Sequence, residues 1–145
     1  MGSVEYDERV LHRGLAFARV VAVLFLLGAI LDAASVLQIL AMAGGQYAPI
    51  ICAELGFAGL AVAQVALGAR IYDGGTGATV IGVLVSGFSA LFAIGWFVFL
   101  LVQGGIALLP LLVALGSSVC GVTALVLIPV TRSIGEQRRL LLDGL

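Results

Sequence analysis

The sequence predicts an all-α polytopic membrane protein whose four transmembrane helices form two antiparallel hairpins within a single membrane domain. Three observations support this fold: the composition, four long apolar runs and the placement of arginine. Of the 145 residues, 62% are hydrophobic and 10% are charged, whereas soluble domains contain roughly 25% charged residues. A soluble chain of this size needs many polar residues to cover its surface, so the outer surface is predicted to contact lipid.

Four apolar runs are each close to or above the roughly 20 residues that cross a bilayer as a helix. The predicted spans cover residues 15–42, 48–69, 79–102 and 106–130. Uncharged turns separate the first span from the second and the third from the fourth, whereas the middle turn carries Arg70 and Asp73. Residues 1–14 and 131–145 are predicted to be cytoplasmic segments. Within the first of these, Val4 to Gly14 fits either an amphipathic surface helix or a solvated cap.

Arginine placement predicts the orientation, because loops that stay in the cytoplasm retain Arg and Lys near the span ends. All basic residues are arginines, and all fall on one side of the predicted topology: Arg9, Arg13, Arg19, Arg70, Arg132, Arg138 and Arg139. Both termini are therefore predicted to be cytoplasmic. The absence of lysine beside abundant Ala, Gly and Arg points to a GC-rich bacterium, and hence to a bacterial cytoplasmic (inner) membrane.

Parts of the first half of the chain recur in the second half. Gly44-Gly45 returns sixty residues later as Gly104-Gly105, and Pro49 and Arg70 return as Pro110 and Arg132. This pattern indicates two copies of one hairpin, related by a pseudo-two-fold axis along the membrane normal. Chance alignment of apolar sequence is the alternative explanation.

Small residues at i and i+4 let membrane helices approach closely. Each predicted span contains such residues: Gly28, Gly59, Ala63, Gly82, Ser86, Gly116 and Cys120. We expect them to pack helices within one protomer or between copies. Cys52 and Cys120 lack CxxC spacing and form no metal pattern with the single histidine, so both are interpreted as small buried apolar residues, and neither a metal nor a cofactor is expected.

Asp32 and Glu54 are the two carboxylates inside predicted spans. A charge at mid-helix costs ~2.5–3.5 kcal/mol, so such residues usually face the bundle interior and mark proton or ion paths. Asp32 is predicted to lie roughly 15 Å, and Glu54 roughly 8 Å, from the first turn. Packing of the first hairpin allows the two to be neighbours, sharing a proton or binding a cation, with Ser35, Gln38 and Gln64 as accessory groups. Alternatively, each is protonated and hydrogen-bonded locally, or hydrated near the outer surface.

Enzymatic activity is not expected, because one histidine supports neither a haem, zinc nor Ser-His site, and the Asp73–Gly77 turn lacks the lysine of a phosphate-binding loop. A net charge of −1 gives no reason to expect nucleic acid as a partner. The expected partners are the lipid bilayer and either further copies or a larger membrane complex.

Two functions from different classes remain. The preferred one is a non-enzymatic subunit or accessory that packs against other membrane helices. The alternative is a proton- or cation-coupled transporter or channel component that uses Asp32 and Glu54. The overall plan is similar to that of small four-span transporters of the small multidrug resistance type. That similarity covers hydropathy alone, because the functional glutamate of that family lies in the first span, where this chain has Asp32.

Overall fold

The computed structural model describes residues 7–42, 48–105 and 108–143, and its secondary structure is helical throughout these ranges apart from the connecting turns. The four helices are α1 (Glu8–Met42), α2 (Ala48–Tyr72), α3 (Thr76–Val102) and α4 (Leu109–Asp143). All four are long and apolar enough to cross a membrane. The predicted all-helical class with four membrane-span candidates is thereby confirmed. The predicted turn at 43–47, the first residues of the fourth span and residues 1–6 lie outside the described ranges.

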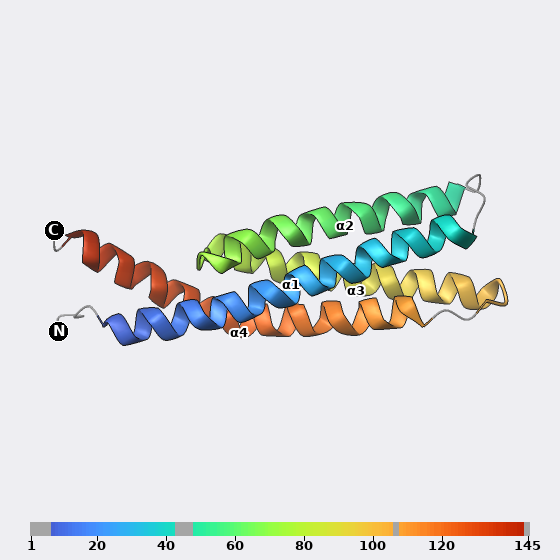
Figure 1. The fold of residues 1–145 in the computed structure, drawn as a ribbon. Coiled ribbons are helices and arrows are strands. Elements are labelled where there is room, and N and C mark those ends of the chain that lie inside the picture. Colours follow the sequence, from blue (N-terminus) through green and yellow to red (C-terminus); the bar gives the residue numbers. More distant parts are fainter. Residues whose placement is uncertain (1–6, 43–47, 106–107, 144–145) are drawn as a thin grey trace.

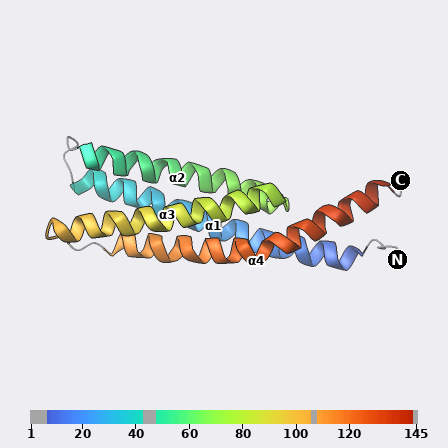
Figure 2. The same cartoon turned by 180° about the vertical axis from the view of Figure 1, so that it is seen from behind.

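The helices form an elongated four-helix bundle in which successive helices run in opposite directions (Figure 1). Figure 2 shows the same bundle from behind. α1 packs beside α2 and α4, and α3 packs beside the same two helices, so α1 and α3 face each other across the bundle axis. The seam between α2 and α3 is the least extensive of the four. Side chains from all four helices can therefore meet on the axis.

Large apolar side chains cover the outside of the bundle, whereas small and polar ones fill its centre. Among the outward leucines, Leu55, Leu84, Leu91 and Leu115 are each at least 66% exposed. The buried positions include nine alanines and several hydroxyl residues. This distribution reverses that of a soluble bundle and suits contact with lipid, where close approach of helices replaces the hydrophobic effect as the source of association.

Two apolar clusters lie at different heights along the axis. The Phe25 cluster includes Phe25, Leu67, Ile71 and Leu127, together with buried alanines from α1, α3 and α4. The Phe57 cluster includes Phe57, Ile39, Val113 and Ala93, with Phe92 packed against it. Within the second cluster, the rings of Phe57 and Phe92 meet edge to face with centroids 5.0 Å apart. The clusters fill the axis on either side of a polar layer.

One end of the bundle, here called the arginine end, holds the start of α1, the α2–α3 turn and the end of α4 (Figure 1). All seven arginines belong to these segments. The guanidinium of Arg19 lies 5.0 Å from the centre of the Tyr72 ring. Gly74 allows the tight α2–α3 turn, because its φ of +77° is a conformation that other residues rarely adopt. The opposite end, here called the loop end, holds the end of α1, the start of α2, the end of α3 and the start of α4 (Figure 1).

α1 and α4 extend further than the predicted spans, with 35 residues each against 25 in α2 and 27 in α3. Asp7 starts α1 by accepting a hydrogen bond from the backbone N–H of Arg9 at 2.9 Å, as an N-cap residue does. α1 then runs without a break into the span, so the described part of residues 4–14 is not a separate surface helix. Hydropathy detects only the apolar part of a helix, so it does not predict the polar turns by which α1 and α4 continue beyond their spans.

Replacing Gly82 with valine should destabilise the bundle, because a Cβ atom at this position would lie 2.8 Å from the buried Phe25 ring. Overpacking of this kind typically costs about 1–3 kcal/mol. Gly87→Val on the same helix is the matched control, since a Cβ there has no atom within 4 Å. Thermal unfolding in detergent should show a lower midpoint for Gly82→Val alone. Equal midpoints for the two variants would contradict this packing.

Candidate functional site

The carboxyl group of Asp32 lies on the bundle axis and is fully buried, with no exposed surface. The side-chain amide of Gln64, from the neighbouring α2, donates a hydrogen bond from Nε2 to Asp32 Oδ2 at 2.9 Å. Gln64 is also fully buried. Asp32 and Gln64 thus form a polar pair across the α1–α2 interface, inside an otherwise apolar region.

Two serines extend this pair to the other helices. Ser89 of α3 donates a long hydrogen bond from its Oγ to Asp32 Oδ1 at 3.5 Å, across the diagonal of the bundle. Ser117 of α4 lies 2.9 Å from Ser89, and either hydroxyl can be the donor. When Ser89 donates to Asp32, Ser117 must donate to Ser89. The polar layer, defined as Asp32, Gln64, Ser89 and Ser117, therefore takes one side chain from each helix.

Helical spacing brings these residues to the axis. Phe25, Asp32 and Ile39 follow one another at intervals of seven residues on α1, and Phe57, Gln64 and Ile71 do the same on α2. Seven residues are close to two helical turns, so each set of three lies along one face of its helix. The face that buries the aromatic and aliphatic residues accordingly carries the polar layer as well.

A glycine makes room for the amide. Gly28 lies one turn before Asp32 on α1, and a Cβ atom added at Gly28 would clash with Oε1 of Gln64. Cys120 of α4 lines the other side of this space, 3.6 Å from the same Cβ position. The Cys120 thiol donates to the backbone carbonyl of Leu24 at 3.3 Å. Gly28 and Cys120 were predicted to pack helices. In the structure Gly28 leaves space for the Gln64 amide, and Cys120 joins α4 to α1 next to that space.

No basic group neutralises Asp32 within the described part of the chain. The ion pair found there joins His12 to Glu8 at 3.5 Å on the exposed start of α1. The arginines all belong to the arginine end, and Arg19 precedes Asp32 by thirteen residues, about 20 Å of helix. An ionised Asp32 would depend on an amide and hydroxyl groups alone for its stabilisation. Burial without a counter-charge strongly favours a neutral carboxyl group or one that holds a cation.

Two buried polar atoms in the middle part of the bundle have no hydrogen-bond partner among the described residues. They are Oε1 of Gln64 and Oγ of Ser86, and both residues are fully buried. Ser86 lies on α3 three residues before Ser89, on the same face. Buried polar atoms without a partner are rare in native proteins and each calls for an explanation. The Gln64 atom adds a free acceptor oxygen to the residue that bonds Asp32, and Ser86 adds an unpartnered hydroxyl one turn from Ser89 on α3.

Apolar clusters close the axis on both sides of the polar layer. On α1, Phe25 and Ile39 each lie seven residues from Asp32, about 10 Å along the helix. On α2, Ile71 and Phe57 lie at the same spacing from Gln64. A proton or ion at Asp32 would thus be occluded from both ends of the bundle.

Glu54 does not share the site of Asp32. It is half-buried on α2, ten residues before Gln64, and so lies about 15 Å further toward the loop end. Since α1 and α2 are antiparallel, Glu54 is level with residues 38–42 of α1 and not with Asp32. Its Oε1 atom is buried and has no partner among the described residues. Glu54 is therefore displaced by nearly three turns from the position opposite Asp32, which Gln64 occupies.

The other predicted accessory residues lie near the site without joining it. Ser35 is buried, but its hydroxyl donates to the carbonyl of Leu31 in its own helix at 3.0 Å. Gln38 is half-buried, one turn beyond Ser35 toward the loop end. Of the five proposed site residues, the structure brings Asp32 and Gln64 into direct contact.

Among the residues predicted to pack helices, Gly28, Gly82, Ser86 and Cys120 are buried, whereas Ala63 and Gly116 are half-buried. Gly59 instead lies on the exposed face of α2, and no atom lies within 4 Å of its Cβ position. Cys52 is also exposed, so the interpretation of this cysteine as buried is wrong. Both α2 residues lie in a helix that is apolar on all sides, where sequence does not distinguish the inner face.

Sequence reasoning missed two members of the polar layer. Neither Ser89 nor Ser117 was among the predicted site residues. The available signal was the spacing on α3, where Thr79, Ser86 and Ser89 share one face and are all fully buried. A hydroxyl stripe on one helix indicates an inward face, although it does not reveal which residue the stripe meets.

Comparison with known proteins leaves the site to be interpreted from its own geometry. No protein-family model, curated protein or solved structure matches this chain. Within the described ranges, no group of three or more His, Cys, Asp or Glu side chains is arranged to hold a metal ion. What the site offers is one carboxyl group, one amide and several hydroxyls.

The hydrogen bond between Asp32 and Gln64 should appear as a coupling energy in a double-mutant cycle. We expect Asp32→Ala and Gln64→Ala to be non-additive by roughly 0.6–1.7 kcal/mol, the range of buried hydrogen bonds between membrane helices. Equilibrium unfolding in mixed detergent measures the cycle. Ser118→Ala is the control for Gln64→Ala, because the Ser118 hydroxyl bonds to Ala114 in its own helix. A cycle of Asp32 with Ser118 should be additive, and additivity in both cycles would contradict the polar layer.

Proposed function

We propose that this protein is a proton- or cation-coupled transporter or channel component in which Asp32 is the group that binds the proton or cation. One observation carries the proposal: Asp32 is fully buried on the bundle axis without a basic partner among the described residues. Ionisable residues inside membrane bundles usually have functional roles because their burial is costly. The unpartnered oxygens of Gln64 and Ser86 support the same interpretation.

The donor set limits what can bind. It consists of carboxylate, amide and hydroxyl oxygens, which suit a proton or a hard cation and not a soft metal. Transport then requires each apolar cluster to open in turn, so that Asp32 reaches one side of the membrane at a time. The α2–α3 seam is the least extensive contact in the bundle, and separation there would uncover the layer at the lowest cost in packing.

Glu54 is proposed as a second group that binds the proton or cation on its way to Asp32. It lies between Asp32 and the loop end, is half-buried, and has one carboxylate oxygen without a partner among the described residues. A proton arriving from the loop end would meet Glu54 first. In this arrangement the two carboxylates act in series, separated by the Phe57 cluster.

We further propose that the arginine end faces the cytoplasm of a bacterial cell, with both termini inside. Segregation of all seven arginines to one end supports this orientation. The diagonal placement of α1 and α3 is compatible with two repeated hairpins about an axis along the bundle. The repeat is not reproduced at the site, however. The sixty-residue offset aligns Asp32 with Phe92, an apolar residue, so the second hairpin has no equivalent of this carboxyl group.

A second candidate function is assembly, with the protein acting as a subunit or accessory of a larger membrane complex. The observation that favours it is the outward position of Gly59, Gly87 and Gly95, each without an atom within 4 Å of its Cβ position. Glycine on a lipid-facing surface allows a further helix, from another protein or a second copy, to approach closely.

Flux measurements distinguish these functions. Purified protein in liposomes with an internal pH dye should dissipate an imposed proton or sodium gradient, and Asp32→Asn should abolish this flux because the amide cannot take up or release a proton. Glu54→Gln should slow the flux without abolishing it. Ser118→Ala, which alters a hydroxyl outside the layer, is the control and should behave as wild type.

Two results would reject the transport proposal. One is wild-type flux in both carboxylate variants, which would remove Asp32 and Glu54 from the path. The other is no flux from wild-type protein that is shown to be folded. In the second case the assembly function is favoured, and a membrane protein copurifying from native membranes would support it.

The orientation can be measured with single cysteines in a Cys52→Ala, Cys120→Ala background. Asp73→Cys, in the α2–α3 turn, and Gln103→Cys, at the end of α3, are both exposed positions at opposite ends of the bundle. A membrane-impermeant maleimide added to intact cells should label Gln103→Cys and leave Asp73→Cys unlabelled until the cells are opened. Labelling of Asp73→Cys from outside would reverse the proposed topology.

A further inference from the structure

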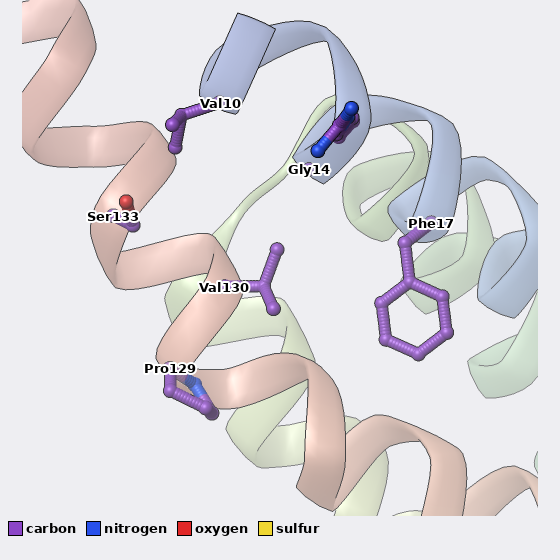
Figure 3. Close-up of a pocket in the computed structure, with 7 residues that line it drawn as sticks. Val10, Gly14, Phe17, Pro129, Val130 and Ser133 are labelled. Atoms are coloured by element: carbon purple, nitrogen blue, oxygen red, sulfur yellow. The ribbon is translucent and has the colours of Figure 1, made fainter. Parts of the chain in front are cut away.

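A groove opens between the start of α1 and the last third of α4, away from the polar layer (Figure 3). Its volume is about 440 Å³. The apolar part of the lining comes from Val10, Phe17, Pro129 and Val130, and the polar part from Arg13 and Ser133. Figure 3 shows Val10 and Phe17 on α1 and Pro129, Val130 and Ser133 on α4 bordering one shared space.

The geometry of α4 explains why the groove exists. Gly14 of α1 lets α4 approach closely, since a Cβ atom there would lie 2.9 Å from Ile134 and 3.2 Å from Val130. Pro129 lies inside α4, where it removes a backbone hydrogen bond and bends the helix. Beyond this region the last part of α4 turns away from the line of its first part (Figure 1). The helices therefore touch at Gly14 and leave a gap beside that contact.

Within the groove, the polar residues Arg13 and Ser133 lie between Val10 at the arginine end and an apolar section toward the middle of the bundle. Arg13 and Ser133 lie about one helical turn nearer to the arginine end than Phe17 and Pro129. The α2–α3 turn lies at the same height along the bundle as Ser133, because a Cβ at Gly74 would lie 3.3 Å from Ile134, the residue after Ser133. If the four helices span a bilayer, this turn marks the headgroup region. The apolar part of the groove then points toward the acyl chains.

We propose that this groove binds one anionic phospholipid of the leaflet at the arginine end. The lipid phosphate lies between the Arg13 guanidinium and the Ser133 hydroxyl, and one acyl chain runs along Phe17, Pro129 and Val130. A guanidinium presents several N–H donors in a geometry that matches a phosphate group. Basic pockets between membrane helices are known to select anionic headgroups in this way.

The charges near the groove favour an anion. Arg13 has no ion-pair partner within the described part of the chain, whereas Glu8 is already paired with His12 at 3.5 Å. Arg9 lies one turn before Arg13, and Arg132 is adjacent to Ser133. Two further acidic residues lie nearby and outside the lining: Glu136 follows Ser133 by a turn and is exposed, and Asp7 precedes Val10 by three residues, where its carboxylate caps α1. The lining itself holds a single charge, which is positive.

A lipid in this position would fill the gap between α1 and the end of α4. The end of α4 is otherwise held to α1 through the Gln137 side chain, whose Oε1 accepts a hydrogen bond from the backbone N–H of Asp7 at 2.8 Å. The inference depends on the protein residing in a membrane, but not on transport by Asp32.

Native mass spectrometry of the full-length protein tests the inference, with phosphatidylglycerol and phosphatidylcholine as probes. We expect one phosphatidylglycerol to be retained per chain and phosphatidylcholine to be lost. Arg13→Gln should weaken retention about fivefold, which corresponds to one arginine at a membrane surface. Val130→Trp, which fills the apolar part of the groove, should also reduce it. Arg70→Gln is the matched control, because Arg70 is an exposed arginine at the same end but outside the groove.

Three outcomes would overturn the inference. They are equal retention of the two lipids, an equal loss in Arg13→Gln and Arg70→Gln, and unchanged retention in Val130→Trp. Ser133→Ala provides a milder variant should Val130→Trp fail to fold, and unchanged retention in Ser133→Ala together with Arg13→Gln would also reject the site. None of these results bears on Asp32, so the lipid site and the transport function fail or succeed separately.

Discussion

The carboxyl group of Asp32 constrains the whole bundle, because a polar group on a dry axis must find its hydrogen bonds in the protein. Gln64 and Ser89 provide them, and Ser117 completes the chain of contacts through Ser89. Each bond crosses from one helix to another. The requirement to satisfy one side chain therefore fixes the relative height of all four helices, which nonpolar packing alone leaves free to slide.

The hydrogen bonds of Asp32 in turn require small residues at the places where the helices meet. Hydrogen bonds of about 3 Å between side chains as short as serine need helices that lie close together. Gly28 leaves space for the Gln64 amide, and Gly82 receives the Phe25 ring that closes the axis next to the polar layer. Glycine in a soluble helix is mainly destabilising. In this bundle it sets where helices touch and where a polar group fits.

Much of the architecture could be predicted from sequence, whereas the partners of the buried carboxylate could not. Four apolar runs give four helices, and a lone aspartate in such a run must face inward. The face of α2 was harder to assign because this helix is apolar on all sides, so the sequence allowed Glu54 as a neighbour of Asp32 and gave Gln64 only as an accessory group. Cys52 was wrongly predicted to be buried for the same reason. Periodicity identifies the inner face of a helix when the outer face is polar. The outer face of a lipid-facing helix is apolar as well, so the two faces look alike in the sequence.

The seven-residue spacing of Phe25, Asp32 and Ile39 restricts how the protein can move. Because the three side chains share one face of α1, turning that helix about its own axis would withdraw both apolar barriers together with the carboxyl group. Such a rotation would remove the α1 side chains from both clusters at once and leave each barrier to the other helices alone. A change in tilt separates the helices at one end while the other end stays closed. The placement of three residues on one line therefore favours rocking of whole helices over rotation as the motion compatible with a sealed membrane.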